Sequence, residues 1–203
     1  MGSRQSTSFE QACLIDGREL LERYAAGERD FHNVTLPGAN LKGVHLSGID
    51  LSRAQLVGAN LSQANFSNAN FSQANLTGVN LERANLFGAF LSGTNLSNAM
   101  LRGANLTESD LSGASLINAD LCDAVLHLAC LSEANLQGAN LTATRLCGAR
   151  LWRANLCGAD LQGADLCDVN LNEANLCGAN LDASDTSEAS MTGAVMPHGE
   201  IHD

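Results

Sequence analysis

Cationic and aromatic residues are both scarce in this sequence. Its 203 residues include 11 Lys and Arg against 22 Asp and Glu, a formal net charge of −11, and aromatic residues make up only 4%. Such a negative charge disfavours non-specific binding to nucleic acids and anionic membranes. No apolar run approaches the ~20 residues of a membrane-spanning helix, and the polar segment 1–11 lacks the apolar stretch of a signal peptide. We therefore expect a cytoplasmic protein that contacts neither nucleic acid nor membrane directly.

Large apolar residues recur at every fifth position along most of the chain, and a small residue stands two places before each. The register holds without a slip from Leu36 to Leu181, and the centres are leucines except Phe66 and Phe71. A period of five matches neither the 3.6-residue period of a helix nor the alternation of a strand. It is typical of a chain that turns a corner once per repeat, with the small and central residues facing inward. Such coils must stack, because one repeat cannot bury its own leucine.

The repeats resemble those of the pentapeptide-repeat proteins of the cyanobacterial type, whose consensus is close to Ala-(Asp/Asn)-Leu-x-x. Literal matches are Ala59-Asn60-Leu61, Ala104-Asn105-Leu106, Ala159-Asp160-Leu161 and Ala179-Asn180-Leu181. The resemblance implies an all-β fold, a right-handed quadrilateral parallel β-helix with four repeats in each coil. The length then corresponds to about eight coils.

Four segments are expected along the chain. Residues 1–13 are predicted to be a disordered leader, and residues 14–30 to hold a short N-terminal capping helix. Asp16 is the expected N-cap, Glu19 stands three places later, and Gly27 is a natural stop. The β-helix is predicted over residues 31–195 and a C-terminal tail over residues 196–203.

Two outward positions of the repeat have expected structural roles. Asn or Asp usually precedes the centre, where stacked side chains can form ladders and cap backbone groups. Glycine often stands two places after the centre, as a type II turn requires. Other corners carry a side chain at that place and are predicted to use a different turn type; they include Arg53, Gln63, Gln73 and Glu133.

The seven cysteines are predicted to be free thiols. With twenty residues per coil, Cys147 stacks on Cys167 and Cys157 stacks on Cys177, but a cytosolic location favours the reduced form. Two cysteines per face fall short of the four converging ligands of a zinc site. No catalytic, cofactor-binding or metal-binding residue is predicted, because no Ser-His-Asp or Cys-His arrangement converges at a concave point.

Outward apolar, aromatic and arginine side chains gather on two adjacent faces around one corner. These residue types are enriched in protein interfaces, although single apolar residues on a surface are also normal. The candidate protein-interaction patch consists of Phe87, Phe90, Val125, His127, Leu128, Arg145, Arg150, Trp152 and Arg153.

The expected function is that of a non-enzymatic scaffold that acts through contacts with another protein, and the resemblance implies a regulatory role. The alternative implied by the same resemblance is a DNA mimic that binds and inhibits or protects type II topoisomerase (DNA gyrase). The acidic rod favours the alternative. The absence of a C-terminal helix and of loops between coils counts against it. We expect a monomer or a weak end-to-end dimer, because the last coil shows no sign of a helical cap.

Overall fold

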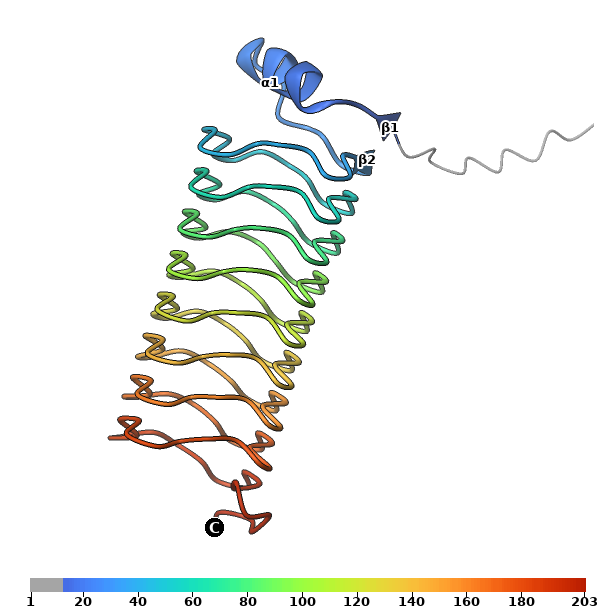
Figure 1. The fold of residues 1–203 in the computed structure, drawn as a ribbon. Helices are drawn as coiled ribbons and strands as arrows, with labels where there is room; N and C mark the ends of the chain where they lie inside the picture. Colours follow the sequence, from blue (N-terminus) through green and yellow to red (C-terminus); the bar gives the residue numbers. More distant parts are fainter. Residues whose placement is uncertain (1–12) are drawn as a thin grey trace, which may run out of the picture.

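The chain forms a four-sided solenoid. The computed structural model describes residues 13–203, so the predicted leader lies outside the described residues except for Cys13. Parallel backbone bridges join residues twenty apart, as between Asn60 and Asn80, and they recur every five residues from Asp30↔Asp50 to Asn175↔Val195. Four pentapeptides therefore complete one coil, and the coils stack into the rod seen in Figure 1.

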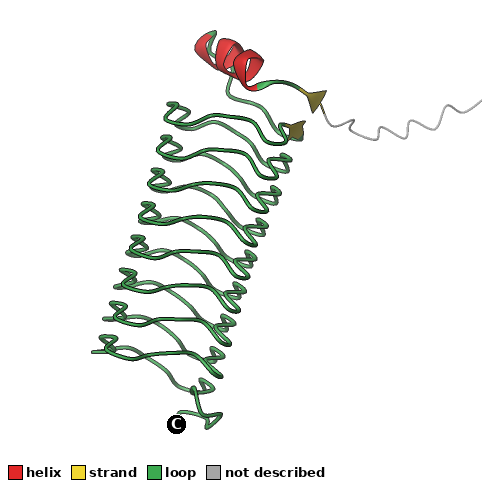
Figure 2. Cartoon of the chain, in the orientation of Figure 1, coloured by secondary structure: helices red, strands yellow, loops and turns green. Residues whose placement is uncertain are grey.

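Regular secondary structure is confined to the N-terminal end. The elements are β1 (Cys13–Leu14), α1 (Gly17–Ala25) and β2 (Val34–Thr35), and β1 pairs with β2 in parallel. The remaining coils are drawn as loops in Figure 2. On each wall, a single residue pairs with its equivalent in the next coil before the chain turns, which is too short a stretch to count as a strand.

The core is a column of small and central residues, as the five-residue spacing predicts. Leu61 and Ala59 are fully buried, and the same holds for nearly every equivalent pair along the rod. The two central phenylalanines, Phe66 and Phe71, lie on neighbouring walls of one coil and meet edge to face, with 5.2 Å between ring centroids. No turn of this core can be buried until the next coil covers it, so stability is shared between neighbours.

Every corner uses the same kind of turn, and the prediction of two turn types is wrong. The third residue of each corner has positive φ whether it is glycine or not: φ is +60° at Gln63, +57° at Arg53 and +65° at Gly58. The N–H of this residue donates to the next coil, as from Gln63 to the carbonyl of Glu82 at 2.8 Å. A corner of another shape would break this stacked bond, so the stacking imposes the left-handed conformation on residues that resist it.

The Asn or Asp before each centre has the two roles predicted for it. Its side-chain oxygen accepts the backbone N–H two residues on, as Asn85 does from Phe87 at 3.2 Å. Where the residue is Asn, its amide can also donate to the equivalent residue of the preceding coil, so Asn65, Asn85 and Asn105 form a ladder with two bonds of 3.1 Å. The asparagines of such a ladder therefore stabilise both their own corners and the stacking of coils.

Helix α1 covers the N-terminal end of the solenoid (Figure 1). Asp16 is its N-cap and accepts the backbone N–H of Glu19 at 2.8 Å. Leu20 is fully buried, and the Tyr24 hydroxyl donates to the carbonyl of Ser47 at 2.8 Å. The opposite end has no helix within residues 13–203: the segment predicted as a tail folds back, and Ile201 forms an antiparallel bridge with Val195.

Candidate interaction surface

An open groove of about 380 Å³ lies on the face of the solenoid that carries Arg83 and Arg102. Its lining is polar and of mixed charge, and Arg102 pairs there with Asp123 at 3.2 Å. Within residues 13–203, no group of three or more His, Cys, Asp or Glu side chains is arranged to hold a metal ion.

The nine residues of the predicted patch fall into three groups. We define the phenylalanine corner as Phe87 and Phe90, and the tryptophan corner as Trp152 and Arg153. The third group, the Leu128 ridge, follows one corner over two successive coils. It comprises the other five residues, Val125, His127, Leu128, Arg145 and Arg150, together with Cys130, which pairs with Arg150 in the next coil.

The phenylalanine corner and the Leu128 ridge are not continuous. Phe87 and Phe90 are 37% and 53% exposed. The coil between them and the ridge carries Glu108 and Asp110, and Asp110 bridges Phe90 on one side and Cys130 on the other. The predicted patch is thus two apolar areas separated by carboxylates.

Leu128 is the outstanding residue of the ridge. Its side chain is 58% exposed although its φ is +58°, a conformation that costs a bulky residue about 1 kcal/mol or more. The side chain lies over Gly148 of the next coil, where an added Cβ would stand 2.8 Å from Leu128 Cδ2. The hydrogen bond from the Leu128 N–H to the next coil is 3.2 Å long, against 2.8–3.1 Å at the equivalent corners.

The ridge also lacks the side-chain oxygens that cap most corners of the rod. Val125, Arg145 and Arg150 stand where Asn or Asp usually precedes the centre, and Val125 follows directly on the ladder of Asn65, Asn85 and Asn105. In the described part of the chain, the backbone N–H groups that they would cap, those of residues 127, 147 and 152, have no protein acceptor. Each substitution forgoes a bond worth about 0.5–1.5 kcal/mol.

Cys130 occupies the same place in its repeat but keeps polar partners. Its sulfur lies 3.1 Å from the Ser112 hydroxyl and 3.6 Å from that of Ser132. Two opposing effects act on the pKa of the Cys130 thiol. Burial alone would raise this pKa, but hydrogen bonds from Ser112, Ser132 and Arg150 to the sulfur outweigh burial. The pKa therefore lies below its ordinary value.

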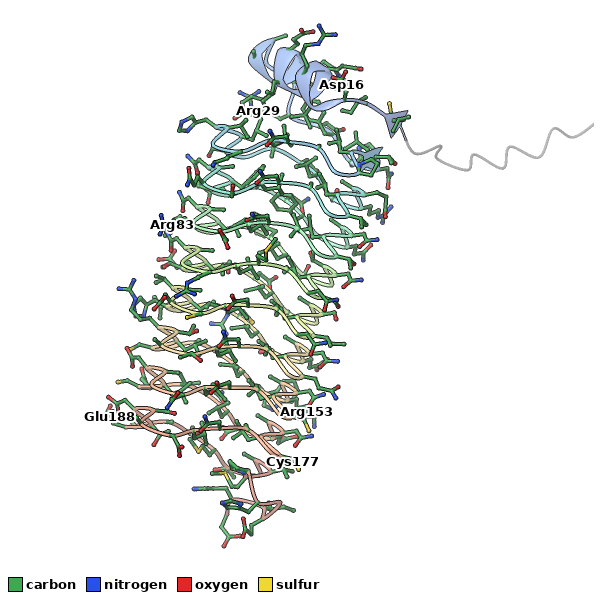
Figure 3. The ribbon with its side chains drawn as sticks, viewed as in Figure 1. Asp16, Arg29, Arg83, Arg153, Cys177 and Glu188 are labelled. Carbon is green, nitrogen blue, oxygen red and sulfur yellow. The ribbon has the colours of Figure 1, made fainter. Side chains whose placement is uncertain are left out.

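The tryptophan corner is held by contacts within the protein. The Arg153 guanidinium lies over the Trp152 ring, 4.3 Å from its centroid, and its Nε donates to Glu173 at 2.7 Å. The Trp152 Nε1 donates to the same carboxylate at 3.4 Å. The hydrogen bond from Arg153 holds the pKa of Glu173 below its usual value, and the one from Trp152 adds to this. Figure 3 shows Arg153 projecting from the wall of the rod.

Sequence reasoning missed four exposed apolar side chains of the described chain. Leu14 and Ile201 lie at its two ends and are 74% and 68% exposed, and Val57 and Met100 lie on the walls and are 44% and 40% exposed. Val57 and Met100 stand at outward positions of their repeats, so the repeat register could have identified them. Both lie on other walls than the ridge; Met100 has Asn80 and Asp120 in the adjacent coils of its column, and Val57 has Pro37 and Thr77. Single apolar residues of this kind are normal on a protein surface.

The pentapeptide-repeat family profile matches residues 30–68, 64–103, 99–138, 134–172 and 159–197. The chain belongs to the pentapeptide-repeat family. This confirms the resemblance, and the fold of this pentapeptide-repeat protein is accordingly the right-handed, four-sided β-helix. No curated protein sequence matches the chain significantly.

Several solved structures are similar to this pentapeptide-repeat protein. HetL, from the cyanobacterium Nostoc sp. strain PCC 7120 and involved in regulating heterocyst differentiation, is 33% identical over 93% of this chain and 100% of its own, with a TM-score of 0.34. A trypsin-treated form of QnrB1, a plasmid-mediated fluoroquinolone resistance protein, is 21% identical over 94% of this chain and 84% of its own, with a TM-score of 0.52. The likeness to QnrB1 concerns the fold alone.

The cysteines of this pentapeptide-repeat protein are free thiols within residues 13–203. Burial and a hydrogen bond to Cys167 raise the pKa of the Cys147 thiol, and the charges of Asp165 and Asp168 add to this. No disulfide joins Cys147 and Cys167. No helix in the described chain is long and apolar enough to cross a membrane.

Proposed function

We propose that this protein is a non-enzymatic scaffold that binds another protein through the Leu128 ridge. The observation that carries the proposal is Leu128 itself, an exposed apolar side chain held at positive φ. Its conformation and its exposure both disfavour the residue in the isolated chain. Eighteen non-glycine residues of the described chain share this positive φ because the stacking of coils imposes it, and Leu128 is the one among them with a large aliphatic side chain. A leucine in the middle of a rigid surface is a suitable anchor for a partner.

The surroundings of Leu128 support an interface rather than a chance apolar residue. Val125 and His127 are half-buried beside it, and Arg145 and Arg150 are exposed on the next coil. The rod holds these groups in fixed positions, since both neighbouring coils bond to each corner. A preformed surface loses little conformational entropy on binding. The phenylalanine corner and the tryptophan corner flank the ridge and would extend the contact.

Affinity capture from the native host tests the proposal with two matched variants. Leu128→Asn replaces the anchor by a residue that tolerates the same corner, and Asn118→Leu creates the same apolar corner on a different wall. A protein retained by the wild type and by Asn118→Leu, but lost by Leu128→Asn, supports the ridge. Equal retention by all three forms contradicts it. Trp152→Ala tests whether the interface extends to the neighbouring wall: weaker retention of the partner would show that it does.

A second candidate is the DNA mimic that binds type II topoisomerase. The observation in its favour is the net charge of −11, with four carboxylates stacked along one corner of the last coils, those of Asp165, Asp168, Asp185 and Glu188. The uninterrupted five-residue register and the folded-back C-terminus count against it. Inhibition of gyrase supercoiling at stoichiometric protein would favour this second candidate over the scaffold.

A further inference from the structure

We propose that the partner presents an acidic segment to the Leu128 ridge, with an apolar side chain against Leu128 and carboxylates against Arg145 and Arg150. This inference rests on the proposed function and names the chemistry of the partner. Three observations carry it: two arginines without carboxylate partners, their position on either side of Leu128, and the carboxylates that border them.

Arg145 and Arg150 have no carboxylate partner in the described chain, unlike Arg102 and Arg153. Arg153 pairs with Glu173 at 2.7 Å, and Arg102 pairs with Asp123 at 3.2 Å. Arg145 and Arg150 form no ion pair within residues 13–203, and both are exposed. In a chain with a net charge of −11, two such guanidinium groups are available to a carboxylate from outside.

The two arginines flank the apolar anchor. They precede the centres of two successive walls, so one corner, with Gly148 at its third residue, lies between them. The Leu128 side chain lies over this same glycine. A cation, an apolar side chain and a second cation therefore follow each other around the corner. An apolar residue flanked by Asp or Glu is the complement of this order.

The arginines give the solenoid less than the residues that usually occupy their positions: within residues 13–203 the guanidinium groups contribute one hydrogen bond, from Arg150 to the Cys130 thiol. One coil further on, Asp165 and Asn170 occupy the same two columns, and their side-chain oxygens accept backbone N–H groups at 3.2 and 3.0 Å. Arg145 and Arg150 forgo those bonds, and a guanidinium cannot accept a hydrogen bond in their place. Local rules broken without an equal internal gain are expected at functional sites.

The charges along the rod favour a short acidic protein segment over nucleic acid. Glu108 and Asp110 lie one coil before Leu128, and Asp165 and Asp168 lie one coil after the arginines. A phosphate backbone running along this corner would meet carboxylates on both sides of the two cations. Two isolated carboxylates can instead reach the two guanidinium groups and avoid that repulsion.

Selection from a random displayed peptide library against the full-length protein tests the inference. We expect enriched peptides to carry Asp or Glu close to Leu, Ile or Phe. A labelled synthetic copy of an enriched peptide is then titrated by fluorescence anisotropy. Its affinity should fall at least about tenfold for the double variant Arg145→Gln, Arg150→Gln, and should weaken steeply as salt rises. Arg83→Gln, which removes an equal charge on another face, should stay within about twofold.

The possible results separate this inference from the proposed function. If binding is lost in Leu128→Asn but unchanged in the double arginine variant, the acidic partner is refuted and the ridge stands. If selected peptides bind regardless of all ridge variants, both proposals are refuted. Binding of a labelled DNA duplex at ~150 mM salt that depends on Arg145 and Arg150 would overturn the choice of a protein segment.

Discussion

Replacing Leu128 by Asn separates a structural role of this leucine from a role in binding. Asn stands at the same corner position elsewhere on the rod: Asn118 has φ +54°, and its Oδ1 lies 2.6 Å from where a Cβ on Gly138 would stand. Leu128 and Gly148 have the same arrangement. The variant therefore keeps the backbone, the hydrogen bonds between coils and a side chain over the glycine.

Two opposing effects determine how much Leu128→Asn changes the free energy of unfolding. Relief of the left-handed leucine contributes about 1 kcal/mol in favour of the variant, because Asn tolerates positive φ far better. The lost apolar contact costs less than about 1 kcal/mol: full burial of a leucine is worth ~2 kcal/mol, and Leu128 is 58% exposed. The free energy of unfolding should therefore change by less than about 1 kcal/mol, while partner binding is lost.

Urea unfolding followed by circular dichroism measures the change, with wild type and variant compared at their midpoints. Asn118→Leu is the reciprocal control and should destabilise by about 1 kcal/mol, because it introduces the same strain on another wall. If Leu128→Asn lost more than about 2 kcal/mol, Leu128 would be a packing residue and the argument from strain would fail.

Three further predictions concern the same surface. Val125→Asn should extend the ladder below Asn105, raise the free energy of unfolding by about 1 kcal/mol in urea titrations, and weaken partner binding; a loss of stability would contradict the ladder account. The fluorescence of the single tryptophan, Trp152, should change as acid protonates Glu173. Because the Glu173 pKa is lowered in the folded protein, this contact is complete above the ordinary value of 4.5 and is lost as pH falls through the lower folded value, and Glu173→Gln should abolish the transition. Iodoacetamide at neutral pH should alkylate Cys130 faster than Cys147, read by mass spectrometry, since the pKa of Cys130 is lowered and that of Cys147 is raised; the reverse order would refute the assigned hydrogen bonds.

The sequence predicted the walls of the solenoid because one physical rule governs them. A leucine every fifth residue has an explanation only if each faces the axis of a turning coil, and the inward position of Leu151 and the outward position of Trp152 follow from the same register. The N-cap of α1 was predictable for a similar reason, since Asp16 and Glu19 form a local motif. The conformation of the corners was not predictable from the sequence. Local propensity favours positive φ chiefly at glycine, but the stacking of coils imposes it also on residues such as Gln63 and Glu133.

The surface was predicted less fully than the core. The five-residue register shows which side chains point outward, but not which of them are held by neighbours. The pairing of Arg153 with Glu173 was available from the twenty-residue step between coils, as was the interruption of the patch by Asp110. The direction in which the Leu128 side chain leans, toward Gly148, depends on the left-handed backbone and needed the structure.

Equivalent residues in other coils show how much stability the ridge residues forgo. Along one column, Asn65, Asn85 and Asn105 each cap a backbone N–H, and then Val125 and Arg145 do not. With Arg150, three forgone bonds at about 0.5–1.5 kcal/mol each and the strain at Leu128 sum to roughly 2.5–6.5 kcal/mol. A domain of this size is stable by only about 5–15 kcal/mol. Uncapped corners also occur elsewhere on the described rod, at His45, Gln55, Phe90, Met100 and Ser115, so a missing cap alone does not mark a site. At the Leu128 ridge the missing caps coincide with the exposed Leu128 and with two arginines that have no carboxylate partner in the described chain, which is why we place the partner there rather than at the more conspicuous Trp152.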